Sequence, residues 1–220
     1  MCCSARSASR RGTGGFTLVE LALVIVVSGI VFATVPVLIF HGVKTLVFLP
    51  KALAVNEAAT EVLHQVVEGG FSILAGQTTV RGLRFAVRRS STEPALWLAE
   101  ASRIGFRTSD GQTVLVRLDS SVLNQEAVKR SLPAPSCTPT LGTEEVIPYH
   151  AQGSVRILPI VRLFRYYVQS GLEVNNPSSC PPPATIRRVD IAFTAQTGSG
   201  NFDQGDARED IISSVAIRVP

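Results

Sequence analysis

Residues 15–36 read GFTLVELALVIVVSGIVFATVP, and this stretch decides the fold of the chain. From Phe16 to Phe40 the one ionisable side chain is Glu20. At ~1.5 Å per residue, a helix over these residues exceeds the ~30 Å thickness of a hydrocarbon core. The sequence therefore predicts a membrane-spanning helix over 16–40. A carboxylate near the end of such a helix is costly in hydrocarbon, so Glu20 is the first candidate functional residue.

The residues before the apolar stretch carry Arg6, Arg10 and Arg11 and no acidic side chain. Basic residues flanking a membrane helix tend to stay in the cytoplasm. We therefore expect a cytoplasmic leader at 1–15 and a periplasmic location for everything after about His41. The formal net charge of +4 comes largely from this leader, so it is weak support for nucleic-acid binding, which we do not expect.

Two other interpretations of the N-terminus stay open. A secretory signal peptide also has a basic start and an apolar centre, but its apolar run is shorter and ends in a small-residue cleavage site. A plain single-pass anchor explains the apolar length but requires neither Gly15-Phe16 nor Glu20. Cys2 and Cys3 precede the apolar stretch, whereas the cysteine of a lipoprotein signal follows it.

The N-terminus resembles that of the type IV pilin superfamily, which includes type IV pilins and the pseudopilins of type II secretion and DNA-uptake systems. The resemblance rests on Gly15 before Phe16, on Thr17-Leu18-Val19, on Glu20 as the fifth residue after the cleavage point, and on Gly29 and Pro36 further along, although Pro36 stands one residue early. It covers roughly the first quarter of the chain.

The resemblance implies a role for each matching residue. A prepilin peptidase would cut between Gly15 and Phe16 and methylate the new amino group of Phe16. The Glu20 carboxylate would set the register between subunits by pairing with a positive N-terminus, since an unpaired charge in a low dielectric is strongly penalised. Gly29 and Pro36 would weaken the helix locally.

The resemblance also implies a fold and a function. We expect an α+β protein in which the helix continues as an amphipathic segment over 41–70 and packs on an antiparallel β-rich domain over 71–220. The function would be that of a structural subunit, a minor pilin or minor pseudopilin, without enzymatic activity or cofactor. Its partners would be other pilin or pseudopilin subunits, the prepilin peptidase and an inner-membrane assembly platform.

A different class of function, an anchored periplasmic binding protein or enzyme, remains the alternative. The histidines, His41, His64 and His150, lie far apart in sequence, and no HExxH, GxSxG or P-loop signature is present. Such a protein would leave the residues from Gly15 to Glu20 unexplained.

Hydrophobic periodicity predicts the elements after the membrane segment. We expect the helix to bend or break near Pro50, to resume over 51–68 and to stop at Gly69-Gly70. The interval 71–90 fits a helix or a strand, and its arginines fit a charged surface better than a nucleic-acid site. The interval 131–148 is rich in proline, serine and threonine, and this composition predicts a loop. Strands are predicted at 96–98, 104–107, 113–118, 161–168, 189–193 and 211–219, with a hairpin turn at Ser109-Asp110-Gly111.

Two further groups of side chains are candidate sites. Cys137 and Cys180 lie in proline- and serine-rich contexts, and in an oxidising compartment we expect them to pair, the alternative being two free thiols. The acidic loop over 198–210 carries Asp203, Asp206 and Asp210 as weak calcium candidates. Their spacing matches no known calcium loop, so a solvated polar loop is the favoured interpretation.

Overall fold

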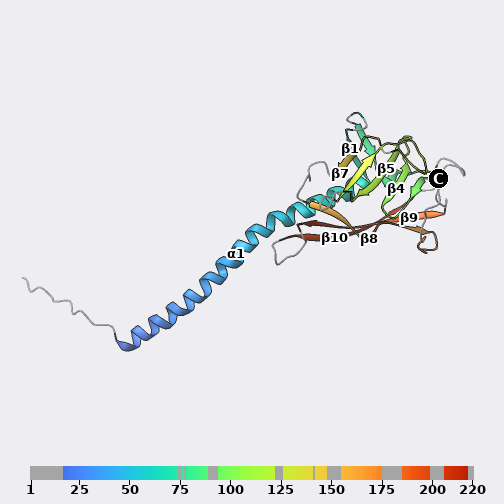
Figure 1. Ribbon diagram of the computed structural model, residues 1–220. Helices are drawn as coiled ribbons and strands as arrows, with labels where there is room; N and C mark the ends of the chain where they lie inside the picture. The colour runs from blue at the N-terminus through green and yellow to red at the C-terminus, as the bar shows by residue number, and fades with distance from the viewer. Residues whose placement is uncertain are drawn as a thin grey trace, which may run out of the picture. The chain divides into compact units, whose positions relative to one another are not determined.

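The computed structural model describes residues 17–73, 76, 78–88, 94–121, 126–140, 142–147, 155–174, 185–198 and 206–217. The chain divides into two compact units, residues 1–46 and 47–220. Helix α1 (Leu18–Val67) contributes to both units, and antiparallel strands follow it (Figure 1). The predicted α+β arrangement is therefore confirmed.

Helix α1 runs through both of its internal prolines. Residues Leu18 to Val67 are helical without interruption, so of the bend or break expected near Pro50 the break is wrong, and the bend stays a prediction. A proline removes one backbone donor and with it one hydrogen bond of the helix. The bonds of the residues before and after Pro36 and Pro50 are sufficient to continue the helix past each proline.

The part of α1 in the second unit buries one face. Its buried residues Val55, Ala59, Val62 and Val66 are spaced by four, three and four positions, which places them on one side of a helix. The helix ends at Val67, and Gly69 follows with φ +93°. A Cβ at Gly69 would lie 2.0 Å from the carbonyl oxygen of Val80, so both the backbone angle and the space require glycine. The predicted stop at Gly69-Gly70 is confirmed.

The described strands form three antiparallel groups. A hairpin directly after the helix pairs β1 with β2, a meander orders five strands as β3-β4-β5-β6-β7, and a third sheet has the order β10-β9-β8. The bounds are β1 Gly69–Ser72, β2 Thr78–Arg81, β3 Leu96–Ala99, β4 Arg103–Arg107, β5 Thr113–Asp119, β6 Ala127–Ser131, β7 Glu145–Ile147, β8 Val155–Val168, β9 Ile186–Thr197 and β10 Arg208–Ala216, with a short 3-10 helix η1 at Leu83–Phe85.

Each of the six predicted strands is present, several with longer bounds. The predicted turn after β4 is also present, with Gly111 at φ +92° and its N–H donating to the Thr108 carbonyl. Of the residues that alternation places on one face of this segment, Ile211 and Val215 in β10 and Ile217 directly after it pack into the core. Val219 lies outside the described residues.

The sequence prediction missed β6 and β7 and left the segment of β1 and β2 undecided between helix and strand. The interval 131–148, predicted as a loop, contains β7, which at three residues is too short to produce an alternating pattern. Strand β6 contains the buried Arg130, which breaks the expected hydrophobic alternation. The ambiguous interval 71–90 holds β2 and η1, preceded by β1.

One hydrophobic core joins the helix and the two larger sheets, which lie against each other in Figure 1. Strand β8 connects the sheets directly. The Phe164 N–H donates to the Ala101 carbonyl (3.1 Å), and the Tyr166 hydroxyl donates to the Glu100 carbonyl (2.8 Å). Burial raises the pKa of Tyr166 well above its usual value, so this hydroxyl remains a donor at neutral pH. Cross-sheet hydrogen bonds therefore accompany this main core, beside which Trp97, Leu98 and Leu115 form a second, smaller cluster.

Candidate functional site

The first turn of α1 is closed by a reciprocal pair of side chains. The Thr17 backbone N–H donates to Oε2 of Glu20 (2.9 Å), and the Glu20 N–H donates to Oγ1 of Thr17 (3.2 Å). The Thr17 hydroxyl also donates to Oε2 of Glu20 (3.0 Å). Thr17 is thus the N-cap and Glu20 the third helical residue of a capping box, which satisfies two of the backbone donors that a helix start leaves free.

The capping box uses only part of the Glu20 carboxylate. Both of its bonds to Thr17 end on Oε2, and within the described part of the chain no bond reaches Oε1. The side chain is exposed and carries a negative charge at a helix N-terminus, where the macrodipole favours an anion. Glu20 can therefore hold the first turn together and still present an oxygen to a cation.

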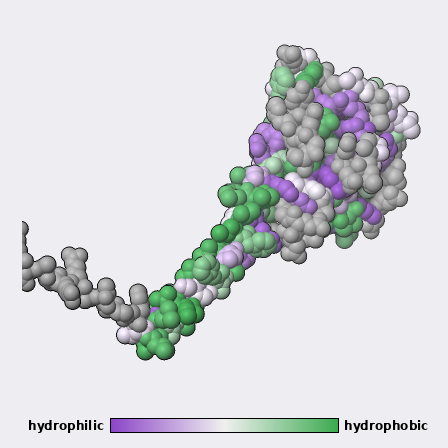
Figure 2. Space-filling model, turned by 60° about the vertical axis from the view of Figure 1, so that its left-hand side comes forward, coloured by the Kyte–Doolittle hydropathy of each residue, from purple (hydrophilic) through white to green (hydrophobic). Residues whose placement is uncertain are grey.

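The surface of α1 around Glu20 is apolar. The large hydrophobic side chains from Leu18 to Val43 are exposed, and hydrophobic residues gather along the helix in Figure 2. By length and composition, α1 can cross a membrane. Such an N-terminal helix suggests membrane anchoring.

Exposed apolar residues continue beyond the first basic side chain of the helix. Lys44 packs its ammonium group over the Phe40 ring, at 4.8 Å from the ring centroid. Beyond it, Leu46, Leu49 and Leu53 are exposed and lie on one side of the helix, at spacings of three and four residues. The exposed apolar surface of α1 is therefore longer than the segment without charges.

The two residues predicted to weaken the helix lie within regular helical structure. A Cβ at Gly29 would meet no atom within 4 Å, so local packing does not require glycine there. Near Pro36, the Thr34 hydroxyl donates to the Ile30 carbonyl (3.0 Å), a back-bond that slightly weakens and often bends helices. The weakening itself remains a prediction.

Several predicted site residues lie outside the described part of the chain: Gly15, Phe16, Cys180 and Asp203. The cleavage and methylation sites therefore remain predictions. Cys137 is disulfide-bonded. Because Cys180 is outside the described residues, its pairing with Cys137 also remains a prediction.

The two described calcium candidates are engaged with different side chains. Asp206 accepts a hydrogen bond from Lys51 of α1 (3.0 Å), and Asp210 accepts one from the Thr194 hydroxyl (2.6 Å). That bond, together with Arg208, lowers the pKa of Asp210. Among the described residues, no group of three or more His, Cys, Asp or Glu could hold a metal ion. The structure thus adds no support for calcium binding.

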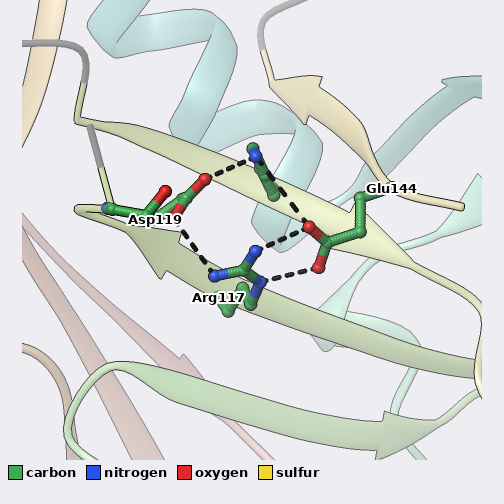
Figure 3. A network of polar contacts seen from close by, with 5 residues as sticks. Arg117, Asp119 and Glu144 are labelled. Atoms are coloured by element: carbon green, nitrogen blue, oxygen red, sulfur yellow. Dashed lines mark hydrogen bonds and ion pairs between the residues drawn. The ribbon is translucent and has the colours of Figure 1, made fainter. Parts of the chain in front are cut away.

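The sequence prediction missed an ion network on the five-stranded sheet (Figure 3). Arg117 donates to both carboxylate oxygens of Glu144, from Nε and Nη2 at 2.6 Å each, and to Asp119 at 3.3 Å. A hydrogen bond from Lys129 holds the pKa of Asp119 well below its usual value, and hydrogen bonds with Glu144 raise the pKa of Arg117. The two positive charges of Arg117 and Lys129 balance the two negative charges of Asp119 and Glu144. The network therefore has a structural role: it joins neighbouring strands of the sheet.

A second missed pair is buried. The side chain of Arg130 is only 2% exposed and pairs with Glu145. Arg130 also donates to the Phe71 carbonyl (2.8 Å), and Glu145 accepts from the Ile73 N–H (3.1 Å). The pair therefore fastens the β1–β2 hairpin to the β6–β7 edge of the five-stranded sheet. Arginine at a buried strand position gives no signal in a hydrophobicity pattern, whereas Thr17-x-x-Glu20 is a readable capping-box signature that the sequence analysis did not use.

Comparison with known families matches residues 10–36 to the prokaryotic N-terminal methylation motif, the type IV pilin-like prepilin signature. The matched segment contains Gly15, Phe16 and Glu20 and overlaps the first turns of α1. Comparisons with curated proteins and with solved structures find no match.

Proposed function

We propose that this protein is a structural subunit of a type IV pilus-like or type II secretion filament, a minor pilin or minor pseudopilin. It is cleaved after Gly15 by a prepilin peptidase, methylated at Phe16 and assembled through α1. The observation that carries the proposal is the position of Glu20: it is the one carboxylate of the exposed apolar part of α1, from Leu18 to Leu53, and it lies in the first turn, within the residues that match the methylation motif.

The length of the apolar surface supports assembly over simple anchoring. From Leu18 to Leu53 the helix spans about 50 Å, whereas a hydrocarbon core is ~30 Å thick. Lipid therefore covers only part of the exposed apolar side chains at any time. The helices of other subunits are the natural cover for the remainder, including Leu46, Leu49 and Leu53.

The geometry of Glu20 supports the pairing step. In the single chain its carboxylate satisfies the helix start through Thr17, and no other described residue bonds to Oε1. After cleavage, the new amino group of Phe16 on a neighbouring subunit supplies the cation. Charge is essential to this pairing but not to the cap, because glutamine also serves at the third position of a capping box.

The second unit supports a structural role. The polar groups around Arg117 and Arg130 bond mainly to one another or to the backbone, although Nη1 of Arg130 is buried without a hydrogen-bond partner among the described residues. This unit would lie on the periplasmic side of the inner membrane. During assembly, α1 would carry it into the filament.

Substitution at Glu20 tests this proposal. Glu20→Gln keeps the cap and removes the charge, Glu20→Ala removes both, and Glu57→Gln removes a carboxylate from the exposed face of the same helix as a matched control. We expect both Glu20 variants to be inserted and cleaved but to enter filaments at least about tenfold less than the parent chain. Without the Glu20 carboxylate, the amino group of Phe16 on the neighbouring subunit would be buried unpaired, which costs several kcal/mol. Glu57→Gln should assemble normally.

Three outcomes separate the interpretations. Normal assembly of Glu20→Gln with failure of Glu20→Ala would reduce the role of Glu20 to helix capping. Normal assembly of both would remove the register role. An uncut chain would favour the anchored binding protein or enzyme.

A further inference from the structure

Strand β10 has one edge without a hydrogen-bonding partner in the described structure. It pairs with β9 through nine consecutive residues, from Arg208 opposite Gln196 to Ala216 opposite Arg188, without a register shift. It is the outer strand of the order β10-β9-β8. The side-chain bonds of Arg208, Asp210 and Ser214 all stay within β9 and β10. An open strand edge of this length is a template for pairing with another strand.

The other edges of the two larger sheets are protected. Strand β8 contains Pro159, shifts its register between Pro159 and Phe164, and bonds to the five-stranded sheet through Phe164. Strand β7 has only three residues, and β3 has four, which are all buried. Proteins commonly protect edges by proline, irregularity and shortness. Within the described strands, β10 lacks all three.

The exposed face of β10 has an apolar centre. Its even-numbered residues face outward, and Ile212 in the middle is 72% exposed, more than any other large hydrophobic side chain in the described strands. The charged residues Arg208, Glu209 and Asp210 all lie at the N-terminal end of the strand. Helix η1 lies close to β10, and its Leu83 shares the core with Val215, but no hydrogen bond joins the two elements among the described residues.

We propose that β10 pairs with β10 of a second copy of this chain, antiparallel and centred on Ile212. This register places Ile212 opposite Ile212, Asp210 opposite Ser214, and Arg208 opposite Ala216. Every charged residue of one strand then meets an uncharged residue of the other. In-register parallel pairing would instead oppose like charges at 208, 209 and 210, which is destabilising.

We infer that the partner of the β10 edge is a second copy of this chain, because the register is self-complementary. A two-fold interface uses the same patch on both chains and closes at two copies. A contact made chiefly of one strand and one isoleucine is small, so the dimer should be weak in dilute solution. Two chains held in the same membrane have a high effective concentration, which favours the pair there.

Cysteine cross-linking of the full chain in its native membrane tests the proposal. Directly opposite residues of an antiparallel pair have Cβ atoms about 4.5–5.5 Å apart, which a disulfide can bridge with a small shift. In a background with Cys2→Ser and Cys3→Ser, Ile212→Cys should form a disulfide-linked homodimer under mild oxidation. Leu172→Cys is the matched control, because Leu172 is 71% exposed and lies in the turn after β8. We expect at least about tenfold more homodimer at 212 than at 172, since random collision links both positions alike.

Co-expression tests the register, and a Glu20→Ala background separates this pairing from filament contacts. Chains with Asp210→Cys and chains with Ser214→Cys should link to each other more than either links to itself. The cross-link at 212 should persist when Glu20→Ala prevents assembly. Equal linking at 212 and 172, no linking at 212, or a link at 212 to a different protein would each overturn the proposal.

Discussion

The two parts of helix α1 have the same secondary structure and opposite surroundings. From Leu18 to Leu53 most side chains are apolar and exposed, whereas from Val55 to Val67 apolar residues are concentrated on one buried face. The first part satisfies its backbone within the helix and leaves its side chains for lipid or other helices. The second part packs its buried face into the core of the sheets. The continuous helix therefore shows that the backbone hydrogen bonds are made within the helix. It does not show whether the side chains contact lipid, other helices or the protein core.

The comparison predicts that the second unit can be disrupted without affecting the first. Arg130→Ala leaves Glu145 buried without its cation, and breaking such a pair costs about 3–5 kcal/mol. Unfolding of the detergent-solubilised chain, followed by fluorescence of its one tryptophan, Trp97, should show this loss. Arg208→Ala, at an exposed pair, should cost less than about 1 kcal/mol. Loss of membrane insertion in Arg130→Ala would contradict the independence of the two parts.

A matched pair of valines compares the two parts directly. Val62 is 1% exposed and Val26 is 61% exposed, and both are helical. Val62→Ala should lower the free energy of unfolding by about 2 kcal/mol, through lost burial and the cavity that remains. Val26→Ala should leave the Trp97 transition unchanged. Equal effects at the two positions would show that the first part also packs into the folded core.

The smallest expected effect concerns acid. The folded-state pKa of Asp119 is lowered, chiefly by Lys129, so its stabilising contribution is present above the unfolded-state pKa of about 4 and is lost as pH falls through the lowered folded-state value. Asp119→Asn should cost about 1.5–2 kcal/mol at neutral pH, in the range of hydrogen bonds to charged groups. Thermal melts from pH 7 to pH 2 should fall less steeply in the variant. Parallel curves for the two chains would exclude Asp119 as the titrating group.

Sequence reasoning was most successful where periodicity is long. The apolar run and the stripe at Val55, Val62 and Val66 predict α1, and alternation predicts β5 and β10. It missed β7 because three residues carry no period, and β6 because Arg130 occupies a buried position. The division of the strands between two sheets, and the use of β8 to connect them, depends on contacts distant in sequence that no local pattern contains.

The candidate site also combines features that local sequence predicts with features that depend on distant contacts. The sequence identifies Glu20 because its charge is anomalous in an apolar helix. Its bonds to Thr17 could also be predicted, since the spacing of a capping box is local. By contrast, the ion network of Arg117 and Glu144 joins residues 27 positions apart, and no spacing rule predicts it.

The proposed function depends first on processing between Gly15 and Phe16. The most direct measurement is the intact mass of the chain purified from its native membrane, together with the sequence and mass of its N-terminal peptide. The account predicts a chain that begins at Phe16, with one methyl group on its amino nitrogen. A chain that retains Met1, or one cut beyond Pro36, would contradict it.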